Sequence, residues 1–128
     1  MRAVIDYGRP YVGISRPKGY RKQKAKQCFW NAARLAIYDR GTYVEGYASG
    51  PTLGVALPHA WVTLDGVHAV DVTWDAPADC HYVGIAFPKE IVARHCLDEQ
   101  RYPVSLLSDS KPSAALRELL AAAPRDVA

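Results

Sequence analysis

Residues 58–75 read PHAWVTLDGVHAVDVTWD, and this stretch decides the fold. Val, Trp, Thr and Ala on both sides of an Asp-Gly pair predict two strands, His59–Thr63 and Val67–Trp74, joined as a β-hairpin. Asp71 is unusual in such a strand, because strands are depleted in Asp and a half-buried carboxylate needs a partner. The pairing register of the hairpin therefore decides what Asp71 can contact.

Two turn geometries fit the Asp-Gly pair. A two-residue loop sends His59 and Asp71 to opposite faces of the hairpin, because successive strand residues alternate between faces. A three-residue loop over residues 64–66, with Gly66 in a left-handed conformation, places His59 opposite Asp71 with Cβ atoms about 5 Å apart. Both geometries suit glycine. The presence of an Asp in the strand favours the second, which gives the carboxylate an imidazole partner.

The remaining pattern predicts an α+β fold, with an antiparallel sheet packed against a helix over Lys26–Asp39. That helix is largely apolar, and its polar stripe recurs at helical spacing. Gly41 is a suitable residue to end it. The other predicted elements are strands at Ala3–Tyr7, Tyr43–Ala48, Tyr82–Phe87 and Tyr102–Leu107, and helices at Pro88–Glu99 and Ser110–Ala123.

Composition predicts one folded domain spanning residues 1–128. The chain is 49% hydrophobic and 23% charged, which is ordinary for a globular protein, and its net charge of +3 is too small to imply nucleic acid. Three cysteines are a small and odd number, which argues against a disulfide framework, so we expect a reducing, cytoplasmic location. We find no signal-peptide pattern and no stretch long enough to span a membrane.

A His–Asp pair can take part in catalysis when a nucleophile lies beside it. Cys28 is the candidate, because it falls in the first turn of the predicted helix, where the helix dipole and the upstream lysines favour a thiolate. The alternative for a free cysteine is a small core residue. The alternative for His59 and Asp71 is a satisfied structural pair.

The order of these residues resembles the transglutaminase-like superfamily, which has a papain-like cysteine fold. KQCFWNAARLA at residues 26–36 resembles the helix in which the family's Cys follows a Gln. YVEGYA at 43–48 is similar to its "V-x-GY" strand. HAWV at 59–62 and VDVTW at 70–74 resemble its "HAWVE…DPT" pattern, although Val72 stands where Pro is usual. The resemblance covers about Lys26 to Trp74, with the strand YVGIAF following.

The resemblance implies that Cys28 is a nucleophile, His59 its general base and acid, and Asp71 the residue that orients His59. Such a triad forms a thioester from an amide and passes it to water, as in a peptidase, amidase or deamidase, or to an amine. The Cys28 backbone N–H with Gln23 or Gln27 would supply the oxyanion donors. The candidates for a substrate cleft are Trp30, Trp61 and Trp74. Neither a cofactor nor a metal is expected.

Three competing interpretations remain. Cys80-His81 and His95-Cys96 have ligand types that zinc prefers, but adjacent strand residues point to opposite faces. A non-catalytic protein-interaction module on the same fold is the second. The third is an acidic protein or nucleic-acid partner attracted by the basic segment Arg16, Lys18, Arg21, Lys22, Lys24 and Lys26. The protein or peptide substrate itself and the oligomeric state are not written in the sequence.

Overall fold

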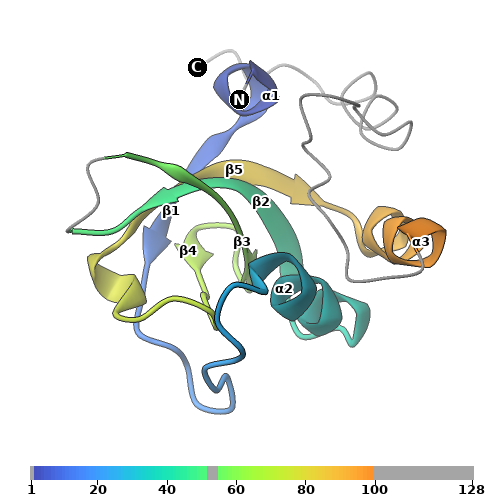
Figure 1. Ribbon diagram of the computed structural model, residues 1–128, viewed down its shortest axis with the longest axis horizontal. Coiled ribbons are helices and arrows are strands. Elements are labelled where there is room, and N and C mark those ends of the chain that lie inside the picture. Colours follow the sequence, from blue (N-terminus) through green and yellow to red (C-terminus); the bar gives the residue numbers. More distant parts are fainter. Residues whose placement is uncertain (1, 52–54, 100–128) are drawn as a thin grey trace.

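The computed structural model describes residues 2–51 and 55–99, which form a small α+β fold (Figure 1). Three α-helices, five strands and one 3₁₀ turn lie in these ranges. In chain order they are α1 (Arg2–Tyr7), β1 (Arg9–Gly13), α2 (Cys28–Ile37), β2 (Thr42–Ser49), β3 (Leu57–Thr63), β4 (His68–Ala69), η1 (Pro77–Asp79), β5 (His81–Phe87) and α3 (Lys89–Glu99). The strand predicted for Tyr102–Leu107 and the helix predicted for Ser110–Ala123 lie outside the described residues.

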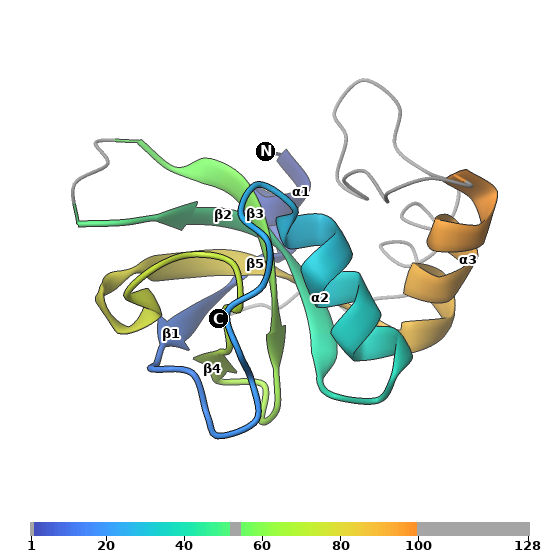
Figure 2. The same ribbon diagram turned by 60° about the horizontal axis from the view of Figure 1, so that its bottom comes forward.

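The five strands form one mixed sheet in the order β3-β2-β5-β1-β4. The β3–β2, β2–β5 and β5–β1 pairs are antiparallel, whereas β1 and β4 are parallel. The sheet curls until its two edges approach, and a single bridge between Val62 and Val70 joins them (Figure 2). The prediction of an antiparallel sheet is therefore only partly right, because the parallel β1–β4 pair was not foreseen.

The curled sheet separates two clusters of buried side chains. Alternate residues of β2 and β3, including Tyr43, Ala60 and Val62, face α2 and α3 in the larger cluster. The residues between them face the inside of the curl, where Val44 and Trp61 pack with five further core residues, namely Tyr11, Ala48, Ala69, Cys80 and Tyr82. Alternation along each strand thus gives both faces of the sheet an apolar partner.

Helix α2 packs on the outer face of the sheet, as predicted (Figure 2). Ala32, Ala33 and Ala36 are almost fully buried, and their small side chains let the helix lie close to the strands. The helix is shorter than the predicted Lys26–Asp39, beginning at Cys28 and ending at Ile37. Asp39, not Gly41, provides the left-handed residue after the helix, with φ of 59°.

The hairpin has the predicted left-handed Gly66, with φ of 79°, but its register differs from both predicted turns. The favoured turn placed Thr63 opposite Val67 and hence Val62 opposite His68, whereas the structure pairs Val62 with Val70. The Asp65 carboxylate accepts hydrogen bonds from the backbone N–H groups of Val67 and His68 and widens the turn. A two-residue shift preserves the faces, since a slip reverses them only when it is odd.

One predicted strand is wrong and another is shorter than predicted. Residues 2–7 form α1, and the neighbouring strand is Arg9–Gly13, which the sequence did not predict. Pro10 is tolerated there because this part of β1 pairs only with β5. The predicted strand Val67–Trp74 is reduced to His68–Ala69, since the chain turns at Asp71.

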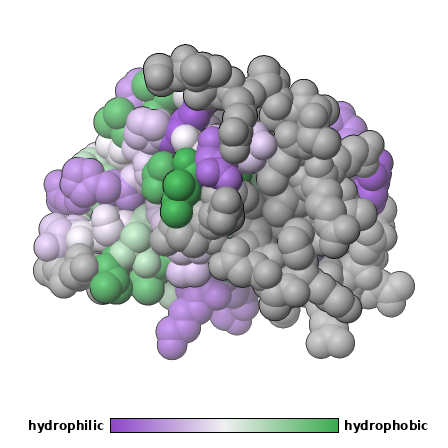
Figure 3. Space-filling view, turned by 90° about the horizontal axis from the view of Figure 1, so that it is seen from above, coloured by the Kyte–Doolittle hydropathy of each residue, from purple (hydrophilic) through white to green (hydrophobic). Residues whose placement is uncertain are grey.

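The surface carries scattered large apolar side chains. In Figure 3, the coloured part of the face seen from above shows small apolar groups separated by polar residues. Such scattering is usual for a folded domain. The exposed large apolar residues of the described ranges are Ile5, Val12, Tyr38, Val55, Leu57, Leu64, Val67 and Val83. Within these ranges, no helix is long and apolar enough to cross a bilayer.

Candidate active site

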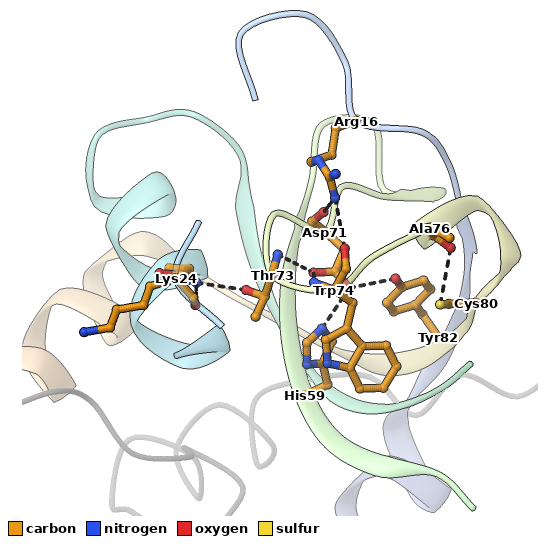
Figure 4. Close-up of polar contacts among 10 residues, drawn as sticks. Arg16, Lys24, His59, Asp71, Thr73, Trp74, Ala76, Cys80 and Tyr82 are labelled. Carbon is orange, nitrogen blue, oxygen red and sulfur yellow. Dashed lines mark hydrogen bonds and ion pairs between the residues drawn. The ribbon is translucent and has the colours of Figure 1, made fainter. Parts of the chain in front are cut away.

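Three segments that are distant in the sequence bring Cys28, His59 and Asp71 together. Cys28 begins α2, His59 lies in β3 and Asp71 follows β4. The predicted contact is confirmed, because His59 Nε2 and Asp71 Oδ2 are 2.8 Å apart (Figure 4). Both side chains are buried, with exposed fractions of 1% and 0%. Asp71 lies in the protein interior because it binds the imidazole.

The Asp71 carboxylate accepts four hydrogen bonds. Oδ2 accepts the His59 bond and a second from the Tyr82 hydroxyl at 2.7 Å. Oδ1 accepts from the backbone N–H groups of Thr73 at 2.9 Å and Trp74 at 3.2 Å. Burial alone would raise the pKa of Asp71, but the bonds from His59, Tyr82 and Thr73 outweigh it, and the pKa is lowered. Asp71 is therefore a carboxylate at neutral pH.

His59 is enclosed by aromatic rings. The Trp74 ring covers it with centroids 4.2 Å apart, and Trp61 stacks beyond it at 6.2 Å. Burial alone would lower the pKa of His59, but hydrogen bonds and charge attraction from Asp71 and Cys28 raise it to about 9. Because Nε2 contacts Asp71, Nδ1 is the ring nitrogen left for the thiol. The imidazole is therefore protonated at neutral pH, stabilised by the Asp71 carboxylate and by Cys28.

Cys28 is half-buried and is the first residue of α2. Interaction with Cys28 is among the causes of the raised pKa of His59. The first N–H groups of a helix have no partner within the helix, and the side chain of the N-cap residue Gln27 does not supply one. The Cys28 N–H is therefore a donor available beside its own sulfur.

The other two cysteines lie in different surroundings. Cys80 is buried, and its thiol donates to the Ala76 carbonyl at 3.5 Å. Burial raises the pKa of both Cys80 and Cys96. Within the described residues, no group of three or more His, Cys, Asp and Glu side chains is placed to hold a metal ion.

Arg16 and Asn31 hold the Asp71 turn in place, a role that the sequence did not predict for either residue. The Arg16 guanidinium donates to the Trp74 carbonyl at 2.9 Å and to the Asp71 carbonyl at 3.3 Å (Figure 4). Asn31 is only 3% exposed, and its amide donates to Thr73 Oγ1 at 3.0 Å and to the Lys24 carbonyl at 2.9 Å. The sequence signal for Asn31 was its place three residues after Cys28, on the polar stripe of the predicted helix.

The three tryptophan candidates for a substrate cleft differ in exposure and position. Trp74 is half-buried over His59 and lines an open groove of about 420 Å³. Trp61 is 1% exposed inside the curl, so it is not a cleft residue, because it fills the core beside Gly84. Trp30 is half-buried on α2 and does not line the groove. Of the three, Trp74 is in position to contact a substrate.

The two glutamine candidates for an oxyanion donor also differ. The Gln23 amide nitrogen already donates to the Arg21 carbonyl at 3.2 Å, and its oxygen accepts from Arg34 at 2.9 Å. Gln23 is thus engaged away from the thiol. Gln27 directly precedes Cys28 and is half-buried, and its backbone carbonyl accepts the N–H of Asn31 at 2.8 Å. Gln27 is the better placed of the two.

The predicted basic segment is less uniform than its sequence suggests. Arg16 is half-buried and binds backbone carbonyls, so its role is structural. Lys22 pairs with Asp75 at 2.5 Å. The exposed members of the segment are Lys18, Arg21, Lys22, Lys24 and Lys26.

The structure thus brings a half-buried cysteine near a buried histidine–aspartate pair at the edge of the curled sheet. Comparison with protein-family models, with curated proteins and with solved structures gives no match. The site is therefore interpreted from its own geometry.

Proposed function

We propose that this chain is a cysteine-dependent enzyme that acts on amides, as a peptidase, amidase, deamidase or acyltransferase. The observation that carries the proposal is the position of His59. It contacts the Asp71 carboxylate at 2.8 Å, and Cys28 lies near enough to contribute to its raised pKa. A histidine linked to both a thiol and a buried carboxylate has the arrangement that cysteine catalysis needs.

The first half-reaction begins with the Cys28 sulfur attacking the amide carbonyl carbon. The carbonyl oxygen takes up the electron pair, and the Cys28 N–H at the start of α2 stabilises the resulting oxyanion. The His59 imidazolium then donates its Nδ1 proton to the amide nitrogen. The carbon–nitrogen bond breaks, an amine leaves, and a thioester on Cys28 remains beside a neutral imidazole.

The second half-reaction reverses the direction of proton transfer. Neutral His59 removes a proton from an incoming water or amine, which attacks the thioester carbonyl. Collapse of the intermediate breaks the carbon–sulfur bond and returns a Cys28 thiolate beside the His59 imidazolium. Water gives an acid, and an amine gives a new amide. Because the pKa of His59 is raised to about 9, the histidine acts first as an acid and only then as a base.

The resemblance to the transglutaminase-like superfamily supports this proposal. It gives the order Cys, His, Asp along the chain, and the described fold places the helix, the strand and the following turn side by side. A papain-like arrangement, with the nucleophile at a helix start and the His–Asp pair on a sheet, is the finer fold assignment we propose. The chemistry of the site carries the proposal, because fold likeness alone does not define an activity.

The test is mass spectrometry of a peptide library incubated with the wild type and with Cys28→Ala. Chain cleavage, conversion of side-chain amides to acids, or gain of an amine would identify which reaction occurs. We expect Cys28→Ala to abolish the change and His59→Ala to remove nearly as much, because the residues act as a unit. A product that forms equally with Cys28→Ala would contradict the proposal.

Thiol reactivity separates the enzyme from a non-catalytic interaction module on the same fold. At mildly acidic pH an ordinary thiol reacts slowly with iodoacetamide, whereas a thiol paired with an imidazolium reacts quickly. We expect fast labelling at Cys28 that is lost in His59→Ala. If Cys28 labels no faster than the denatured chain, the interaction module becomes the better interpretation.

A further inference from the structure

An open groove of about 420 Å³ lies between the segment that leads into Cys28 and the loop that carries Trp74. The first side contributes Lys26 and the second contributes Thr73 and Trp74. The Trp74 ring also covers His59, with centroids 4.2 Å apart, so the groove ends against the aromatic side chain that shields the candidate site. Gly50, Pro51 and Cys80 also line the groove. Cys28 does not itself line the groove, which lies beside it because Lys26, two residues earlier, does.

The charges of the groove do not balance. Two lysines and one aspartate line it, and Lys22 pairs with Asp75 at 2.5 Å. The hydrogen bond and charge of Lys22 lower the pKa of Asp75, so this pair is ionised and neutralises itself. Lys26 is exposed, and within the described residues it has no carboxylate partner. One ammonium group therefore remains for a ligand.

The backbone at Lys26 is also unusual. Its φ of 66° lies in the left-handed region, which a long side chain adopts at a cost. Glycine or asparagine would fit this position more easily. Lys26 stands two residues before Cys28, so its Cα is within about 7 Å of the Cys28 Cα. A strained position next to the nucleophile thus holds a cation that faces a groove.

We propose that the groove binds an acidic side chain of the substrate, located beside the reacting amide, with Lys26 as its counter-ion and Trp74 as its apolar wall. This inference rests on the proposed function and names the class of substrate, an acidic peptide. A single carboxylate matches the single uncompensated ammonium. Nucleic acid would require a row of cations along the groove, and here the second lysine is already neutralised.

Two matched probes test the proposal, chloroacetyl-glutamyl amide and chloroacetyl-glutaminyl amide. Each probe alkylates a thiol, whose sulfur displaces chloride from the chloroacetyl group. The two probes differ only in the charge of the side chain. The measurement is the second-order rate of labelling at Cys28, located by peptide mapping so that Cys80 and Cys96 are counted separately. We expect the wild type to prefer the glutamyl probe about threefold to fivefold, as for one exposed ion pair. High salt should reduce the preference.

The variants assign the preference to Lys26. Lys26→Asn suits the left-handed backbone and removes the charge, so the two probes should react at equal rates. Lys26→Arg keeps the charge and should keep the preference. Lys24→Gln is the matched control, because Lys24 is also exposed and does not line the groove. It should leave the ratio unchanged.

The outcomes separate this inference from the function on which it rests. Equal rates for both probes in the wild type, with fast labelling that depends on His59, would overturn the acidic-peptide inference and leave the enzyme proposal standing. A preference that persists in Lys26→Asn would overturn the role of Lys26. Slow labelling of Cys28 by both probes, unchanged in His59→Ala, would overturn the enzyme proposal and this inference together.

Discussion

At the scale of the residue, Asp71 joins two functions in one carboxylate. One oxygen is held by the backbone N–H groups of Thr73 and Trp74, and the other faces His59 and Tyr82. The turn therefore fixes the orientation of the carboxylate that the histidine needs. A side chain that satisfies the backbone and the imidazole at the same time is difficult to replace.

We predict that Asp71→Asn lowers activity by about 10²- to 10⁴-fold. The amide oxygen must face the two backbone N–H groups, so the NH₂ group must face His59. The NH₂ group donates to Nε2, which moves the histidine proton to Nδ1 and leaves no acceptor for the thiol proton. The measurement is kcat/KM with the identified substrate, or the labelling rate of Cys28 where none is yet known.

Asp65→Asn is the control for this variant, because Asp65 also accepts backbone N–H bonds in the hairpin but does not contact His59. It should retain activity. An Asp71→Asn protein as active as the wild type would show that the orientation of His59 does not depend on Asp71.

We predict that Tyr82→Phe destabilises the fold by about 1.5–3 kcal/mol, the usual range for a hydrogen bond to a charged group. The variant removes the 2.7 Å bond to Asp71 Oδ2 while leaving the ring in the core. Urea unfolding gives the measurement. Tyr11→Phe is the matched control, since Tyr11 lies in the same cluster without contacting Asp71. A loss no larger than that of Tyr11→Phe would contradict the prediction.

At the scale of the element, the hairpin turn depends on Gly66. A Cβ at this position would meet no atom within 4 Å, so only the left-handed backbone opposes a side chain. We predict that Gly66→Ala destabilises the protein by about 1 kcal/mol, whereas Gly66→Asn costs less because Asn tolerates this conformation. Urea unfolding midpoints of the two variants provide the test. Equal midpoints for Ala and the wild type would argue against this account of the turn.

Local patterns predicted the elements whose neighbours agree with them. Three elements were predicted to within two residues at each end: the Cys28 helix, the strand Tyr43–Ala48 and the strand Tyr82–Phe87. Their bounds were predictable because alternation and helical spacing follow directly from burial. The contact between His59 and Asp71 was predicted from chemistry: a carboxylate in a strand needs a partner.

Contacts between distant segments were not predictable in the same way. Residues 67–69 resemble a strand that should pair with β3, yet they pair in parallel with β1, which itself resembles a loop. The choice depends on the Asp65 side chain, which widens the turn, and on the Val12 N–H, which bonds the Val67 carbonyl at 2.9 Å. The roles of Arg16 and Asn31 were likewise missed, since each bonds a residue more than 40 positions away.

At the scale of the whole molecule, the curl of the sheet makes the site. The bridge between Val62 and Val70 joins the two edge segments, so the turn that follows β4 lies beside β3 (Figure 2). His59 precedes this bridge on one side and Asp71 follows it on the other. Burial of the pair is therefore a consequence of closing the sheet, and the ionisation of the pair is coupled to the folding of the whole domain.

This coupling predicts a window of maximum stability between about pH 4 and pH 6.5. The raised pKa of His59 stabilises the folded state fully below its unfolded value of 6.5, and the contribution is lost as the pH rises through about 9. The lowered pKa of Asp71 acts in the opposite direction: its contribution is present above its ordinary value of 3.8 and is lost as the pH falls through its folded value. The loss of the His59 contribution at alkaline pH should lower the free energy of unfolding by on the order of 3 kcal/mol at most.

Urea unfolding at pH 6 and pH 9.5 measures this decrease in the free energy of unfolding directly. In Cys28→Ser the decline should begin at lower pH, because the interaction with Cys28 is one cause of the raised pKa of His59. In His59→Gln this part of the pH dependence should disappear, since glutamine does not titrate. His68→Gln is the control, because His68 is exposed and pairs with Asp65 at the turn. If His59→Gln declines between these pH values as steeply as the wild type, the buried pair is not the origin of the pH dependence.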